Sequence, residues 1–299
     1  MYTLHYWPVI PGRAEHVRLA FEQAGVEYTD ASTDAASLMK HIGPDGLTVH
    51  PLHFACPLLE VSLGSSSNKS RKTEQSQDAK SAQSESSTSS VYISQTPAIL
   101  AYLAPKLGLD GTEGEDLDEE LIQIRRAQVN QLTLTALDLN NEAHDVSKAL
   151  DQPELRPSLE LILLPSQTHH PISSAAYYEE QKEEALKYSE QFRNQRIPKF
   201  YSIFEANLKS NPASSGYLIG KSVTTADLVL FQVLEGIKFA FPRLTKSLQE
   251  SGKYNHVFAF QEKIAALPRI KAYLESDRRK AFSNGVFRRY PELDAELES

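Results

Sequence analysis

The first 30 residues follow the order strand, helix, strand, and this order constrains the fold more than any other feature. Residues 2–6 are aromatic-rich and typical of a short β-strand, which two following prolines end. Residues 12–24 carry apolar side chains at helical spacing, and Gly25 is suited to the C-cap of a helix. Residues 26–29 can form a second strand. Because a helix connects them, the two strands are expected to be parallel, with the helix on one face of the sheet.

A second pair of strands is expected around a serine-rich segment. Residues 58–61 begin a strand just after a proline, and residues 91–93 are its expected hairpin partner. Residues 65–90 hold 11 serines in 26 positions, and their only apolar residues are two alanines. Such a segment cannot bury enough apolar surface to offset the entropy of ordering it. We therefore predict a disordered insertion over about 64–90.

The rest of the chain has a helical pattern and divides the protein into two domains. Residues 109–116 are rich in glycine and acidic residues, which is typical of a linker. We predict an α/β domain over 1–108 and an all-helical domain over 117–299. The helices are expected at 117–144, 175–208 with a break or kink near Pro198, 227–238, 257–267 and 270–274. A second insertion, broken by three prolines, is expected over about 147–167.

Composition and charge exclude several classes of protein. Lys and Arg number 31 against 39 Asp and Glu, and the net charge of −8 argues against nucleic-acid or anionic-membrane partners. The single cysteine, Cys56, excludes an intramolecular disulfide and fits a reducing compartment. No apolar run reaches the roughly 20 residues of a membrane helix, and the N-terminus lacks a secretory pattern. We expect a soluble, cytoplasmic protein.

Four short motifs occur along the chain, and their order is as informative as their residues. They are Tyr6 to Glu15 with an internal Gly-Arg pair, Cys56-Pro57-Leu58-Leu59, Ser94-Gln95-Thr96, and Tyr217 to Gly220 followed by Thr224 to Asp227. The ordered set resembles the tyrosine-type cytosolic glutathione transferases, the pi and sigma groups especially. The resemblance covers nearly the whole chain outside the two insertions. It implies a thioredoxin-like α/β N-terminal domain and an all-α C-terminal domain.

The resemblance makes Tyr6 the catalytic residue of a glutathione transferase. The thiolate of glutathione is the nucleophile, but a free thiol has a pKa of about 8.5 and is mostly protonated at neutral pH. A phenol O–H aimed at the sulfur, together with the positive end of the first helix, would stabilise the thiolate. The thiolate would then attack an electrophilic, mostly apolar small molecule.

The resemblance also implies the residues that bind glutathione. They are Arg13, Lys40, Cys56, Pro57, Gln95, Thr96 and Asp138. Gln95 and Thr96 would hold the γ-glutamyl end, because a hydroxyl and helix-starting N–H groups suit a carboxylate. The backbone of Cys56 would pair with the tripeptide, with a cis Pro57 setting its direction. Asp138 matches an acidic residue that reaches glutathione across the family's dimer interface.

The family layout implies a pocket for the second substrate between the domains. Its expected lining is Trp7, Val9, Ile10, His144 and Phe287. Glutathione would be a co-substrate rather than a tightly bound cofactor, and the protein would be a homodimer. No metal site is expected, because the two histidine motifs, His144-Asp145 and His169-His170, are far apart in sequence.

Several features leave alternatives open. One extra residue, around Ile10-Pro11, separates Tyr6 from Gly12, and the family's glycine-carboxylate clamp has no clear match beyond Lys40. These departures favour a non-catalytic binding or scaffold module. A glutathione-dependent isomerase or a biosynthetic transferase is a second alternative. Cys56 is either a small buried filler or a residue that forms a mixed disulfide with glutathione.

Overall fold

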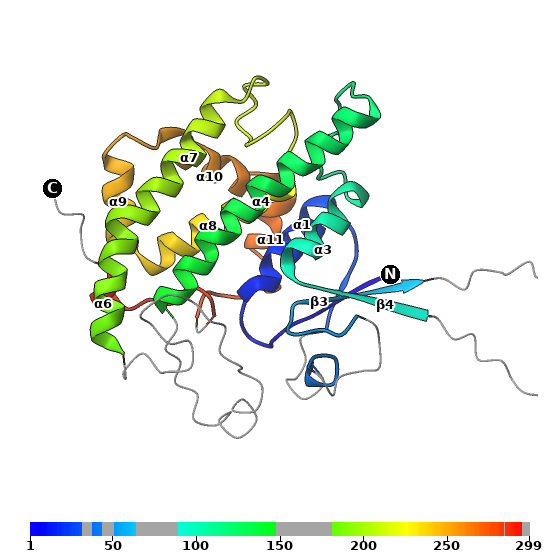
Figure 1. Ribbon diagram of the computed structural model, residues 1–299, viewed down its shortest axis with the longest axis horizontal. Helices are drawn as coiled ribbons and strands as arrows, with labels where there is room; N and C mark the ends of the chain where they lie inside the picture. The colour runs from blue at the N-terminus through cyan, green and yellow to red at the C-terminus, as the bar shows by residue number, and fades with distance from the viewer. Residues whose placement is uncertain (32–37, 44–50, 64–88, 148–180, 284, 295–299) are drawn as a thin grey trace, which may run out of the picture.

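The chain folds into an α/β part followed by an all-helical part, as the sequence predicts (Figure 1). The computed structural model describes residues 1–31, 38–43, 51–63, 89–147, 181–283 and 285–294. Almost all of the first expected insertion and most of the second lie outside the described residues, and so do His169 and His170. The predicted linker falls between the two parts, although the exact domain boundaries stay a prediction.

Four strands form one mixed sheet in the order β2-β1-β3-β4. The strands are β1 (Tyr2–His5), β2 (Thr29–Asp30), β3 (Leu58–Leu63) and β4 (Ser89–Ser94). β1 and β2 are parallel, and β3 and β4 form an antiparallel hairpin, so both predicted pairings are confirmed. β1 and β3 are also antiparallel, which places β1 in the interior of the sheet.

The second strand begins later than the predicted residues 26–29. Gly25 has a φ of 69° and closes helix α1 (Glu15–Ala24). The N–H of Gly25 then donates to Glu22 O, and the N–H of Val26 donates to Phe21 O. These bonds are those of a Schellman motif, so Val26 belongs to the helix cap and cannot pair with β1.

The helices of the first part pack on one face of the sheet. A 3-10 turn, η1 (Gly12–Ala14), leads directly into α1, and α3 (Thr96–Leu103) follows β4. Leu4 and Tyr6 of the first strand region point toward this face, and both join the same buried cluster as Val17 and Phe21 of α1. Alternation along the strand turns His5 to the opposite face.

Residues from the described ranges 38–43 and 51–57, which precede β3, lie against the opposite face of the sheet. The ring of His41 lies 4.9 Å from that of His5, centroid to centroid. His53 Nδ1 lies 3.1 Å from the hydroxyl oxygen of Ser94 in β4. These contacts hold the segment that ends at Pro57 against the sheet.

The second part contains seven α-helices among the described residues. They are α4 (Glu119–Ser147), α6 (Lys182–Gln191), α7 (Ile197–Ser210), α8 (Thr225–Ala240), α9 (Pro242–Glu250), α10 (Asn255–Ala265) and α11 (Pro268–Leu274). α8 is buried nearly all round and packs against α1, α4 and α10, as its apolar sequence predicts. None of the helices in the described ranges is long and apolar enough to cross a membrane.

The break expected near Pro198 is confirmed. Five residues in π-helical geometry, Phe192–Arg196, join α6 to α7 just before this proline. Pro198 has no N–H to donate and its ring crowds the preceding turn, so the helix widens there instead of continuing regularly.

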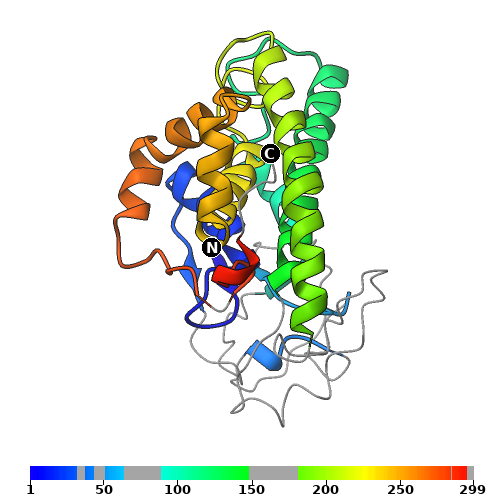
Figure 2. The ribbon, with the colours of Figure 1, turned by 90° about the vertical axis from the view of Figure 1, so that its left-hand side faces the viewer.

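The C-terminal segment runs back from α11 to the first part of the chain. Figure 2 shows this segment, in red, beside the blue N-terminal turn. A Cβ on Gly285 would lie 3.7 Å from Gly12 N, and the ring of Phe287 lies directly over Gly236 of α8. The tail therefore packs on both α8 and the turn that precedes α1.

Candidate active site

Tyr6 lies one residue after β1, with its phenol at the start of the first helix. Its side chain is buried, with 5% exposed, and its hydroxyl oxygen accepts a hydrogen bond from the Arg13 N–H at 2.9 Å. Burial, and after it the charge of Cys56, raises the pKa of Tyr6 to about 12. The phenol therefore stays protonated at neutral pH, and its O–H remains as a hydrogen-bond donor.

The extra residue between Tyr6 and Gly12 is accommodated in the turn. Val9 takes a φ of 58° and is 78% exposed. The N–H of Ile10 donates to Pro8 O at 2.8 Å, which tightens the chain at this point. Gly12 has a φ of 50°, and a Cβ there would collide with the Tyr6 ring and hydroxyl. The longer turn thus still places the Arg13 N–H within hydrogen-bond distance of the Tyr6 oxygen.

The Cys56-Pro57 peptide bond is cis, as the resemblance implies. Backbone hydrogen bonding from Cys56 and Trp7 favours a lower pKa of the Cys56 thiol. Burial nevertheless raises the pKa of this thiol to about 12. Because the thiolate is the reactive form, this environment argues against the mixed-disulfide hypothesis.

Gln95 and Thr96 form a helix start with an unused hydroxyl. Gln95 has a φ of 71° and precedes α3, while Thr96 is only 4% exposed. The Thr96 hydroxyl oxygen is buried and has no hydrogen-bond partner among the described residues. A buried polar atom without a partner is unusual, and at the positive end of a helix it suits an anionic ligand.

The sheet register brings these groups to one end of the sheet. His5 pairs with Leu58, and Leu58 pairs with Ser94, so the three residues form one row across three strands. Tyr6, the Cys56-Pro57 bond and Gln95 are the neighbours of that row in sequence. They therefore leave the sheet at the same end, which makes this end the candidate site.

The remaining candidate residues are placed as follows. Arg13 Nη2 donates to Asn141 Oδ1 of α4 at 3.1 Å, and Asp138 lies exposed one turn earlier on that helix. Lys40 is exposed, and no contact within the described residues connects it to Tyr6. The other predicted positions divide into two groups: Trp7 and Ile10 are half-buried, whereas His144 and Phe287 are buried.

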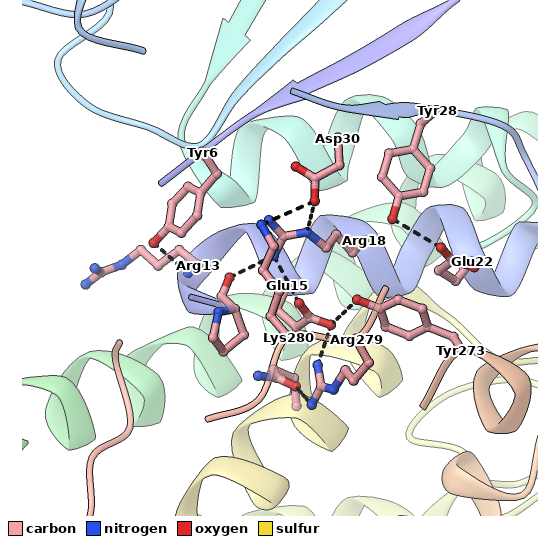
Figure 3. A network of polar contacts seen from close by, with 12 residues as sticks. Tyr6, Arg13, Glu15, Arg18, Glu22, Tyr28, Asp30, Tyr273, Arg279 and Lys280 are labelled. Atoms are coloured by element: carbon pink, nitrogen blue, oxygen red, sulfur yellow. Dashed lines mark hydrogen bonds and ion pairs between the residues drawn. The ribbon is translucent and has the colours of Figure 1, made fainter. Parts of the chain in front are cut away.

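Sequence reasoning missed a group of charged residues near Tyr6 (Figure 3). Arg18 donates to Pro11 O and to Glu15, and Arg279 of the C-terminal segment also pairs with Glu15. The sequence does contain one signal, because Arg18 is a charged residue within the apolar face of the first helix. The structure shows that its side chain is buried. Within the described ranges no three His, Cys, Asp or Glu residues are grouped to hold a metal ion.

Comparisons with known proteins agree with this layout. Residues 166–277 match the family model described as "Glutathione S-transferase, C-terminal domain". A class-mu 26 kDa glutathione S-transferase isozyme of Fasciola hepatica is 26% identical over 186 residues, which is 62% of this chain and 60% of that protein. A glutathione S-transferase of Plasmodium yoelii yoelii is 28% identical over 91 residues, 30% of this chain and 40% of that protein. The C-terminal part of the chain therefore resembles the glutathione S-transferase C-terminal domain, and the chain is similar in sequence to glutathione S-transferases.

The fold of the glutathione transferase family extends over nearly the whole chain. The solved sigma-class enzyme of Fasciola hepatica matches it with a TM-score of 0.59 and 17% identity, covering 95% of this chain and 98% of that one. The predicted thioredoxin-like domain and the predicted all-α domain are thereby confirmed. The sequence matches span only 60% and 40% of the two curated glutathione transferases. They show a similarity to glutathione transferases, and the activity of this chain is a separate question.

Proposed function

We propose that the protein is a glutathione transferase that transfers the glutathione thiolate to an electrophilic carbon of an apolar small molecule. The observation that carries this proposal is the Tyr6 phenol. Its oxygen already accepts the Arg13 N–H at 2.9 Å, which leaves its proton to point at a ligand. The orphan hydroxyl of Thr96 belongs to the same end of the sheet. Together they offer a donor for sulfur and a binding group for a carboxylate.

The chemistry required of Tyr6 is modest in free energy. Lowering the pKa of a bound thiol by about two units takes roughly 2.7 kcal/mol of selective stabilisation of the thiolate. A preorganised O–H donor in a buried site supplies stabilisation of this order. The thiol proton leaves, the sulfur forms a bond with the electrophilic carbon, and the leaving group departs with its electron pair. A Tyr6 pKa of about 12 keeps the donor protonated throughout.

The other binding roles extend the proposal. Gln95 and Thr96 would hold the γ-glutamyl carboxylate, and the backbone of Cys56, oriented by the cis bond to Pro57, would pair with the tripeptide. Arg13 lies at the same helix start, and Lys40 and Asp138 are assigned only by their resemblance to family positions. A cytoplasmic homodimer with no tightly bound cofactor is likewise expected from the family alone.

The second substrate would lie over the turn after Tyr6. Trp7 and Ile10 are half-buried there, and Val9 is largely exposed, so apolar surface is available beside the phenol. His144 and Phe287 are buried, which supports a packing role for them rather than direct contact with the second substrate.

An ultraviolet difference titration of bound glutathione tests the proposal. We expect the bound thiol to ionise about two pH units below free glutathione, and Tyr6→Phe to abolish that shift. Tyr2→Phe is the matched control, because Tyr2 lies on the same strand and packs on Phe21 with ring centroids 5.2 Å apart. It should keep the shift. Glutathione that binds without ionising would indicate a binding module, and no binding would favour the scaffold alternative.

A further inference from the structure

Arg18 is a buried cation that holds the turn in front of the Tyr6 site (Figure 3). Its side chain is 1% exposed. Nη1 donates to Pro11 O at 2.9 Å and to Glu15 at 3.0 Å, and Nε donates to Asp30 at 2.8 Å. One guanidinium therefore joins the turn, the first helix and β2.

Both carboxylates around Arg18 have a second cation. Glu15, which is fully buried, also pairs with Arg279 and accepts the Tyr273 O–H at 2.6 Å. Asp30 lies 3.5 Å from Lys280 Nζ. The acids are therefore compensated without Arg18, so the need to neutralise them does not account for its presence.

The contact with Pro11 leads directly to the Tyr6 hydroxyl. The Pro11 carbonyl that Arg18 holds is two residues before the N–H of Arg13, which donates to Tyr6 at 2.9 Å. The guanidinium carbon also lies 6.0 Å from the centroid of the Tyr6 ring. Arg18 thus binds the turn directly and lies at the limit of cation–π range from the aromatic side chain that the turn must orient.

The turn needs such an anchor because it is one residue longer than the family pattern. Val9 lies in the left-handed region, and the Ile10 N–H bond to Pro8 O is internal to the turn. The Arg18–Pro11 bond instead ties the turn to the rigid first helix. The planar guanidinium donates to Pro11, Glu15 and Asp30 from fixed positions, a geometry that the compact ammonium group of lysine does not reproduce.

We propose that Arg18 is a positioning residue for the transferase reaction, acting through the Pro11 carbonyl to keep the Arg13 N–H on the Tyr6 oxygen and the phenol proton on the glutathione sulfur. This inference rests on the proposed function. It predicts that Arg18 affects the ionisation of bound glutathione although it does not touch the tripeptide.

The test is the same titration, performed on Arg18→Met and Arg18→Lys. We expect Arg18→Met to raise the pKa of the bound thiol by about one unit, which lowers the ratio of thiolate to thiol about tenfold and the thiolate fraction at pH 7 about threefold. The pH profile of kcat/KM should move upward by the same amount, with a smaller change in the KM for glutathione. Arg18→Lys keeps the positive charge but not the simultaneous bonds to Pro11, Glu15 and Asp30. The pKa of the glutathione thiol bound to this variant should therefore also be raised. If Arg18→Met does not fold, Arg18→Lys decides alone.

Arg269→Met is the matched control. The Arg269 guanidinium donates to the carbonyls of Gln23 and Ala24, at 3.1 and 2.9 Å, and so ties down the other end of the first helix. This variant should lose stability but keep the wild-type thiol pKa. An unchanged thiol pKa in the Arg18 variants, an equal shift in the control, or full recovery by Arg18→Lys would overturn the inference. If only Tyr6→Phe raises the pKa of the bound thiol, the proposed function stands without the Arg18 inference. If Tyr6→Phe leaves that pKa unchanged, the proposed function and the inference both fail.

Discussion

At the scale of single residues, the structure shows how the turn after Tyr6 absorbs one extra amino acid. A β-branched residue is costly in the left-handed region, yet Val9 occupies it with a φ of 58°. The sequence indicates where the extra residue lies, around Ile10-Pro11. It cannot indicate which residue takes the positive φ, because that choice depends on closing the chain between β1 and the first helix.

Val9→Gly is therefore expected to stabilise the protein. The left-handed conformation costs an L-residue roughly 1–2 kcal/mol, and glycine returns about 0.5–1 kcal/mol of that through its greater entropy in the unfolded chain. We expect the free energy of unfolding to rise by about 0.5–1 kcal/mol in urea denaturation. Val91→Gly, at a valine of β4 that is 45% exposed, is the matched control and should lower it. Equal destabilisation in both variants would contradict this account.

The candidate site shows a similar division at the residue scale. Tyr6, Gln95 and Thr96 could be assigned because each lies in a short motif with a recognisable order. Glu15 could not, because two of its partners, Tyr273 and Arg279, come from the distant C-terminal part of the chain. Arg279, for example, pairs with Glu15 across 264 positions, and the local sequence around either residue does not predict this pairing.

At the scale of elements, strong periodicity predicted most helices, and local endings decided the errors. α9 was missed, because it begins at Pro242 only two residues after α8 ends. Its signal was present in Leu244 and Leu248, which are buried one turn apart. The strand predicted over 26–29 begins only at Thr29 for a related reason, since the helix cap at Gly25 uses the N–H group of Val26.

The Thr-x-x-Asp pattern of Thr224 to Asp227 is typical of a capping box, and the structure forms one at the start of α8. Asp227, fully buried, accepts the N–H groups of Leu218 and Thr224 at 2.8 Å each and the Thr224 hydroxyl at 2.6 Å. Its carboxylate therefore closes the loop before the central helix as well as the helix itself.

Asp227→Ala should lower the free energy of unfolding by about 2–3 kcal/mol, because it removes a cap and leaves buried N–H groups without a partner. Asp118→Ala is the matched control. Asp118 caps the exposed start of α4 through one bond, to the Leu121 N–H at 2.8 Å, and should cost about 1 kcal/mol. Urea denaturation of both variants measures the difference. Equal losses would show that burial of the Asp227 cap adds nothing.

At the scale of the whole molecule, the first helix is the element on which both parts meet. It packs on the sheet and also contacts α8 and α11, while Arg13 reaches α4. The sequence predicts two domains but not this shared surface, because helix faces alone do not specify their partners. His16 lies within the surface, where it is fully buried beside Asn140 of α4.

Burial lowers the pKa of His16 to about 4, which makes the whole molecule sensitive to acid. The unfolded chain binds a proton at this histidine near pH 6.5, whereas the folded protein does so only near pH 4. The contribution of neutral His16 to the free energy of unfolding is therefore fully present above pH 6.5 and is lost as the pH falls toward 4. Between pH 7 and pH 5 the wild type should lose about 2 kcal/mol through this group. His16→Leu should remove that loss in urea denaturation, whereas His256→Leu, at a histidine with 52% of its side chain exposed, should keep it. The same loss in His16→Leu as in the wild type would place the acid sensitivity elsewhere in the molecule.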